Sequence, residues 1–330
     1  QFHLLHLNVY YTNTNSSFVE VVVKETVILI IQSKTNTSGY CVVKLVDNKN
    51  KNKDSDEITL LSFGGDETCK RHTLMMKYVS VWSSLNEIDK SKNYNEWIPF
   101  TDNYDNPITI KIDHDFCGGM RSVVGGSNNH LLFITHYPNE IRVFDLNTFQ
   151  LIKNDSLPID FEYHCFVLKS ENKQEMMGKK IEMLLFCRSN GLSIEYDENN
   201  NTFQFHQLPV CKDIELFYGY AHVCINDVIL FFGGLCGVST CSNISRSVHK
   251  YSIPKKTWTT FEHTLPSSLD SCVAILNEED NDIHIIGGRD DKRRTVSTHM
   301  KTKVRTWDTS YLVMICLFIC FDEIQSNLID

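Results

Sequence analysis

Short apolar runs that end in a tight turn recur along most of this chain. Three of them, residues 60–65, 228–234 and 283–288, end in a glycine pair. Two more, residues 131–136 and 183–188, have the same pattern without the glycines. Runs this short, rich in β-branched and aromatic residues and bounded by turns, predict β-strands.

The runs are spaced like the units of a repeat protein. The residue that opens each closing turn lies at position 64, 135, 187, 233 or 287, so the intervals are 71, 52, 46 and 54 residues. Internal repeats of about 50 residues are typical of propellers. Five units are therefore readable.

Each unit contains further strand-like segments around its central run. First strands are predicted at residues 41–45, 121–124, 163–168, 221–225 and 272–276. After the closing turn comes an alternating segment such as residues 247–253, then a polar turn, then an aromatic residue that opens a fourth strand. Four strands per repeat is the composition of a propeller blade.

Three units carry two large side chains seven residues apart, on either side of the turn between the third and fourth strands. The pairs are Tyr196 with Phe203, Tyr251 with Trp258, and Met300 with Trp307. Side chains of this size can pack between neighbouring blades and bury area that an isolated blade cannot. The spacing therefore predicts a third-to-fourth hairpin of fixed register.

The glycine pair followed by spaced aromatic residues resembles the kelch motif, and the architecture resembles the kelch and galactose oxidase propellers. The motif residues are Gly64, Gly65, Gly233, Gly234, Tyr251, Trp258, Gly287, Gly288 and Trp307. The resemblance covers residues 39–307 and implies an all-β, kelch-like propeller of four-stranded blades. Galactose oxidase holds copper with tyrosines and histidines, and these do not occur here at matching positions, so no activity is carried over.

Residues 40–307 form the predicted propeller, between an N-terminal segment, 1–39, and an atypical apolar tail, 308–330. Five blades are readable and six fit the chain length better, while the last unit shows no fourth strand. Residues 18–23 and 26–31 are rich in β-branched residues, so at least one of them is expected to be a strand that helps to close the ring. The tail is the alternative source of the missing strand.

Charge and cysteine content narrow the class of partner and the compartment. The 32 Lys and Arg residues against 41 Asp and Glu give a net charge of −9, which disfavours nucleic acid and anionic membranes. Most of the 12 cysteines lie in apolar runs, as buried thiols do. The longest apolar run, 311–321, has 11 residues, and a transmembrane helix needs about 20. Without a signal peptide, we expect a cytoplasmic protein.

Several cysteines and histidines are candidate metal ligands. Aligning the first strands places Cys41, Cys165 and Cys272 in one column and His164 with His222 in the next. These side chains could form a metal ring, but their spacing matches no known ligand set, and buried side chains are the simpler interpretation. The usual signatures of hydrolases, nucleotide enzymes and zinc proteases are also absent. We therefore predict no cofactor, no metal and no enzymatic activity.

The charged loop 289–294 follows the last glycine pair, where kelch-like propellers present residues to partners. Its arginines, Arg289, Arg293 and Arg294, could hold an acidic peptide through bidentate contacts, or the loop could pair its charges internally. The predicted function is a protein-protein interaction module that binds a protein or peptide through inter-strand loops. The alternatives are a metal-dependent enzyme on a propeller scaffold, or a divergent paralogue without specific activity.

Overall fold

The computed structural model describes most of the chain. The described residues are 3–4, 8–11, 16–23, 26–33, 40–45, 57–64, 72–79, 95–110, 119–169, 180–237, 243–277 and 280–307. Only the backbone is described up to residue 40 and at residues 57 and 79. Gly65 and the tail 308–330, about which the sequence made predictions, lie outside these residues.

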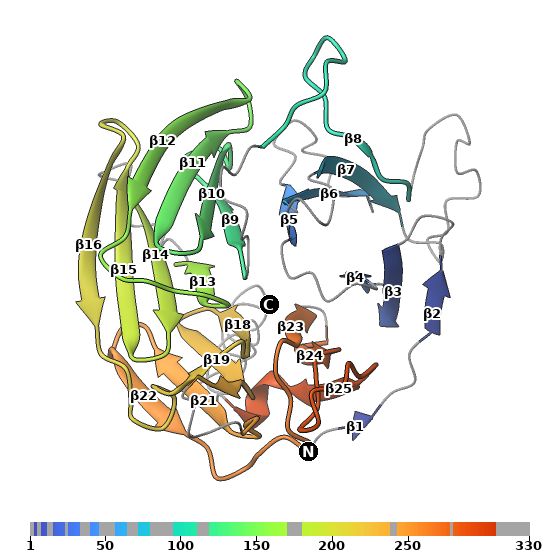
Figure 1. The fold of residues 1–330 in the computed structure, drawn as a ribbon, viewed down its shortest axis with the longest axis vertical. Helices are drawn as coiled ribbons and strands as arrows, with labels where there is room; N and C mark the ends of the chain where they lie inside the picture. Colours follow the sequence, from blue (N-terminus) through green and yellow to red (C-terminus); the bar gives the residue numbers. More distant parts are fainter. Residues whose placement is uncertain are drawn as a thin grey trace, which may run out of the picture. The chain divides into compact units, whose positions relative to one another are not determined.

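Antiparallel sheets make up nearly all of the regular structure (Figure 1). The one helix among the described residues is a single 3-10 turn, Val304–Thr306, and no helix in this part of the chain is long and apolar enough to cross a membrane. Five sheets are four-stranded blades, and the fold is a β-propeller. The predicted all-β class and the four-stranded blade are therefore confirmed.

Three blades lie in the first two thirds of the chain. The first consists of β5 (Tyr40–Leu45), β6 (Glu57–Gly64), β7 (His72–Val79) and β8 (Ile98–Pro99). The second consists of β9 (Arg121–Gly125), β10 (Leu131–His136), β11 (Glu140–Asp145) and β12 (Gln150–Ser156). The third consists of β13 (Cys165–Leu168), β14 (Lys180–Cys187), β15 (Asn190–Asp197) and β16 (Thr202–Leu208).

Two blades follow. The fourth consists of β18 (Ala221–Ile225), β19 (Val228–Phe232), β21 (Val248–Ser252) and β22 (Thr257–Thr260). The last consists of β23 (Val273–Asn277), β24 (Asp282–Ile286), β25 (His299–Lys303) and β1 (His3–Leu4). Two short strands, β17 (Phe217–Tyr218) and β20 (Leu235–Cys236), lie in the segments after β16 and β19.

The chain forms two compact units. The larger unit comprises residues 8–219 and 237–241 and contains the first three blades. The smaller unit comprises residues 1–7, 220–236 and 242–330 and contains the fourth and last blades.

The last blade takes its outer strand from the other end of the chain. β1 pairs antiparallel with β25, with His3 opposite Lys301 and Leu4 opposite Met300. Residues 18–23 and 26–31 are strands as expected, but they lie in β3 (Ser16–Val23) and β4 (Thr26–Ser33). With β2 (Asn8–Tyr11) they form a separate three-stranded sheet of the larger unit. The described residues form five four-stranded blades and not six, and β1, rather than β3 or β4, completes the last blade.

Second strands are continuous apolar runs because both of their faces are buried. In β10, Leu132 and Ile134 pack with β5 and β6 of the first blade, whereas Leu131 and Phe133 pack with the third blade. The ring of Phe133 lies 5.2 Å from that of Tyr196 on β15, so an aromatic residue packs between neighbouring blades as predicted.

The predicted hairpin register is confirmed in two units and wrong in the third. Tyr196 lies directly opposite Phe203, and Tyr251 directly opposite Trp258. Trp307 instead follows the 3-10 turn, because the edge of β25 that a fourth strand would use is already paired with β1. Its ring packs against two aromatic residues of the fourth blade, Phe232 and Phe261, at 6.0 and 5.1 Å.

A glycine of the closing pair is required where another segment passes close to the turn. Gly233 has φ +70°, and a Cβ on it would lie 2.1 Å from the carbonyl oxygen of Leu269. The next residue, Gly234, donates its N–H to that same oxygen at 2.8 Å. The glycines therefore let the connection that enters the last blade lie against the turn.

Candidate interaction surfaces

The strand register of the third blade places three loops at one end of its sheet. Cys165 lies opposite Phe186, and Gly191 lies opposite Leu208, so the loop entering β13, the β14–β15 turn and the loop leaving β16 share this end. We call it the connection end. Because loops on a rigid scaffold are where binding residues concentrate, this end is the first place to look for a site.

Arg188 is the central side chain at the connection end. It occupies the β14–β15 turn at φ +53°, and its guanidinium carbon lies 4.6 Å from the ring centroid of Tyr218. One Nη2–H donates to the Glu162 carboxylate. The Arg188 side chain is still 41% exposed, so an ion pair and a stacked ring hold a cation in place at the surface.

Apolar and aromatic groups surround this cation. The rings of Tyr163 and Tyr218 lie 6.0 Å apart, and the N–H of Gly219 donates to the carbonyl of Tyr163 at 3.0 Å. Leu216 is 43% exposed. Burial raises the pKa of Tyr218, so its phenol is neutral at ordinary pH. We call Glu162, Tyr163, Arg188, Leu216 and Tyr218 together the Arg188 surface.

The Arg188 surface was not found from the sequence. Glu162 and Tyr218 are 26 and 30 residues from Arg188 along the chain, and no local spacing connects them. The available signal was positional, because Arg188 occupies the place of the second glycine in the closing pair of other units. The pairing of β13 with β14 brings Glu162 to Arg188, and the segment that follows β16 brings Tyr218 to it.

In the loop 289–294, for which binding was predicted, two of the three arginines form ion pairs with aspartates. Arg289 makes a bidentate contact with the buried Asp270, with Nε and Nη2 at 3.1 and 2.7 Å from its two oxygens. Nε and Nη2 of Arg294 both donate to one oxygen of Asp290, Oδ2, at 2.8 and 2.6 Å, and its Oδ1 accepts the backbone N–H groups of Lys292 and Arg294. These hydrogen bonds lower the pKa of Asp290. Arg293 is exposed at the loop tip, and binding by the three arginines stays a prediction.

The residues of the predicted metal column have other partners where their contacts are described. Nε2 of His164 lies 2.6 Å from the hydroxyl of Thr135, and Sγ of Cys41 lies 2.8 Å from that of Ser122. Burial raises the pKa of Cys272 to about 12, which opposes the thiolate that a metal would need. Within the described ranges, no three His, Cys, Asp or Glu residues are grouped as a metal site would require.

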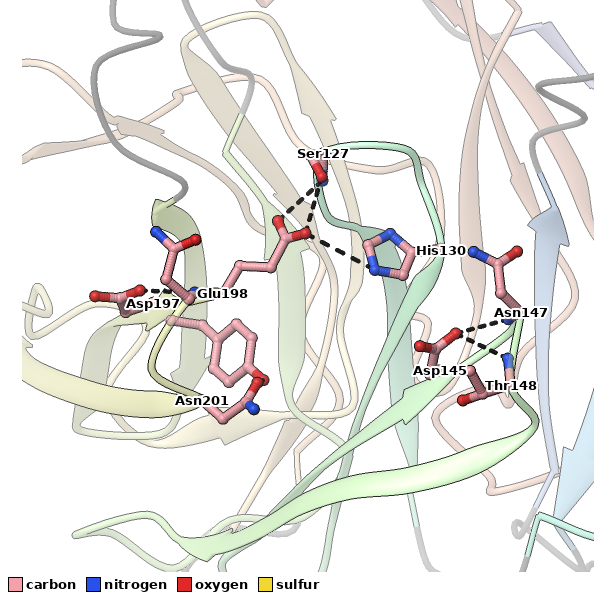
Figure 2. A network of polar contacts seen from close by, with 10 residues as sticks. Ser127, His130, Asp145, Asn147, Thr148, Asp197, Glu198 and Asn201 are labelled. Atoms are coloured by element: carbon pink, nitrogen blue, oxygen red, sulfur yellow. Dashed lines mark hydrogen bonds and ion pairs between the residues drawn. The ribbon is translucent and has the colours of Figure 1, made fainter.

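A polar network lies at the opposite end of the second and third blades (Figure 2). The Glu198 carboxylate, in the β15–β16 turn, accepts hydrogen bonds from the N–H and Oγ of Ser127 at 3.1 and 2.8 Å. Nε2 of His130 lies 3.8 Å from the same carboxylate. Ser127 and His130 belong to the β9–β10 turn of the second blade, so the Glu198 carboxylate of the third blade connects two neighbouring blades. These contacts indicate a structural role.

Comparison with known proteins shows that this chain shares its fold with solved structures. No family model matches this chain, and no curated protein matches it. Solved structures do resemble it, among them that of YjhT, with a TM-score of 0.52 over 88% of this chain and 89% of the other. YjhT is a propeller. At 11% sequence identity this likeness shows the fold alone, and membership of the kelch family stays a prediction.

The propeller scaffold explains why the Arg188 surface is well defined. The β14–β15 turn, which carries Arg188, follows a strand that is buried in the blade core. Leu185 and Cys187 on this strand, β14, are 0% and 1% exposed. Side chains attached to such strands have little conformational freedom. The surface therefore presents its charge and its rings in one arrangement.

Proposed function

We propose that this propeller binds another protein or a peptide at its connection end, with the Arg188 surface as the contact. The observation that carries the proposal is the guanidinium of Arg188, which is stacked on Tyr218, paired with Glu162 and still 41% exposed. Arginine and tyrosine are over-represented among the residues that dominate protein-protein affinity.

The chemistry of the surface indicates how a partner would be held. The exposed part of the Arg188 guanidinium carries N–H donors beyond the one given to Glu162, so a carbonyl or carboxylate of the partner would accept hydrogen bonds from it. The exposed Leu216 and the neighbouring Tyr163 would be covered by apolar side chains of the partner. Since Glu162 already fixes the guanidinium, binding would cost little side-chain entropy.

Affinity capture with matched variants tests the proposal. Wild-type protein, Arg188→Ala and the control Lys255→Ala would be used as baits, and the recovered partner would then be titrated by calorimetry. Lys255 is an exposed cation in the β21–β22 turn, so its loss changes net charge equally without touching the connection end. We expect Arg188→Ala to weaken binding by at least about tenfold and Lys255→Ala to leave it unchanged.

Leu216→Asp is a second probe of the same surface, since it introduces a charge without changing Arg188. Thermal melts of all variants would show that each is folded. Equal affinity of wild type, Arg188→Ala and Leu216→Asp for every recovered partner would contradict the proposal.

A further inference from the structure

The two faces of the last blade differ in chemistry. On β24 and β25, Ile283, Ile285 and Met300 point into the hydrophobic core shared with the fourth blade. The alternate residues form the opposite face, which carries His284 and Asp282 on β24. Both are fully buried, so this face holds titratable groups in a site that excludes water.

A histidine pair lies at the centre of this polar face. Nδ1 of His284 is 2.8 Å from Nε2 of His299, and the two side chains have 0% and 3% exposure. Nε2 of His284 makes no hydrogen bond within the described residues. A neutral pair needs one proton between the two facing nitrogens, whereas a doubly protonated pair would place two N–H groups against each other.

The charges around the pair act in opposite directions: the Lys301 ammonium disfavours protonation of His284, whereas the Asp280 and Asp282 carboxylates favour it. The charged residues are Asp280 and Asp282 before and within β24, and Lys301 and Lys303 on β25. Lys301 and Lys303 both pair with Asp282, at 2.5 and 2.8 Å, so the two negative and two positive charges balance when the histidines are neutral. β23 has no titratable residue. On the other neighbouring strand, β1, the backbone of His3 lies opposite Lys301, and the side chain of His3 is not among the described ones.

The direction of the pH effect follows from the pKa values. Burial, the neighbouring His299 and the Lys301 ammonium lower the pKa of His284 to about 4, and burial and Lys301 lower that of His299. Free histidine titrates near about 6.5, so the unfolded segment binds more protons than the folded blade as the pH falls below that value. Stability from the neutral pair is complete above about pH 6.5 and is lost as the pH falls towards 4.

We propose that the His284–His299 pair makes the last blade an acid-sensitive element, which opens at mildly acidic pH before the other blades and releases β1. The location supports this because His299 lies on β25, and β25 holds β1 through Met300 and Lys301. The expected result is local opening of β23–β25 rather than simultaneous unfolding of the propeller.

Hydrogen-deuterium exchange at pH 7.5 and 5.0, corrected for the intrinsic exchange rate, tests the proposal. In the wild-type protein, amides of β24 and β25 should lose about tenfold or more protection at pH 5.0 relative to β14 and β15, which contain no histidine. The double variant His284→Asn, His299→Gln replaces the two histidines by amides, which do not titrate. In this variant, the loss of protection of β24 and β25 relative to β14 and β15 should stay below about twofold.

Two further variants keep the experiment decisive. His284→Gln alone serves if the double variant does not fold. His249→Gln removes another buried histidine of the same unit, on β21, and should behave like the wild type. The proposal is overturned if the wild-type ratio does not change with pH, or if the double variant loses protection as the wild type does.

Discussion

At the residue scale, the closing glycines are the positions where the sequence was most informative. Gly233 and Gly288 both have positive φ and both lie against backbone of the connection that enters the last blade. A glycine pair after an apolar run predicts such a turn from sequence alone, since no other residue tolerates both the conformation and the close approach. Local motifs of this kind need no knowledge of distant contacts.

Gly233→Ala is expected to destabilise the protein strongly. Its Cβ would lie 2.1 Å from the Leu269 carbonyl oxygen, and its φ of +70° is unfavourable for alanine, so we expect a loss of about 2 to 4 kcal/mol in the free energy of unfolding. Gly125→Ala is the matched control, because its Cβ would meet neighbours at 3.4 Å and beyond. Denaturant melts would measure both, and equal losses would contradict the explanation.

Arg188 shows why other residues could not be predicted. Its role depends on Glu162 and Tyr218, which reach it only after β13, β14 and the loop following β16 have been placed by sheet register. The arginines of loop 289–294 illustrate the converse problem. Sequence identifies them as adjacent charges, but Asp270, which pairs with Arg289, is 19 residues away.

At the scale of elements, Trp307 does not lie in the predicted fourth strand, because the outer edge of β25 is paired with β1. The spacing from Met300 predicted a fourth strand, but β1 pairs with β25, and the chain turns into Val304–Thr306 instead. The tryptophan remains a core residue, with 2% exposure and its Nε1–H donated to Thr302 at 3.1 Å. Side-chain type therefore predicted burial correctly, whereas secondary structure depended on a strand about 300 residues distant.

Trp307→Ala is expected to cost about 3 to 5 kcal/mol of unfolding free energy, because it leaves a cavity beside Phe232 and Phe261 and removes a buried hydrogen bond. Trp258→Ala is the comparison, since Trp258 is only half-buried and packs on Tyr251 within one blade. Its loss should be clearly smaller. A similar cost for the two substitutions would show that packing between the two blades of the smaller unit adds little.

At the scale of the whole molecule, chelation separates the binding module from the metal-dependent alternative. We expect purified protein to contain no stoichiometric metal and its thermal midpoint to be unaffected by a chelator. The reason is that His164 and Cys41 are hydrogen-bonded to hydroxyl groups, and burial opposes ionisation of Cys272. Elemental analysis and melts with and without chelator provide the measurement, and stoichiometric metal with a lower midpoint would favour the enzyme.

The blade architecture could be read from the sequence because it repeats. Each first strand was placed within two residues of its observed start, as with 121–124 against Arg121–Gly125 and 163–168 against Cys165–Leu168. The N-terminal sheet of β2, β3 and β4 has no motif to repeat, so only the presence of strands was predictable there. The repeated motif predicts the blades themselves. The outer strand of the last blade could not be predicted from it, because this strand, β1, comes from the N-terminal part of the chain and pairs with β25.

The positive φ of Arg188 has a consequence for how the divergence of this repeat is understood. A profile built on glycine pairs would score Cys187 and Arg188 as erosion of the motif, and a left-handed arginine does cost about 1 kcal/mol. Yet the same replacement gives the connection end its cation. The loss of a glycine pair in this repeat therefore does not leave an empty turn, because in the third blade it places a charged side chain at a fixed position.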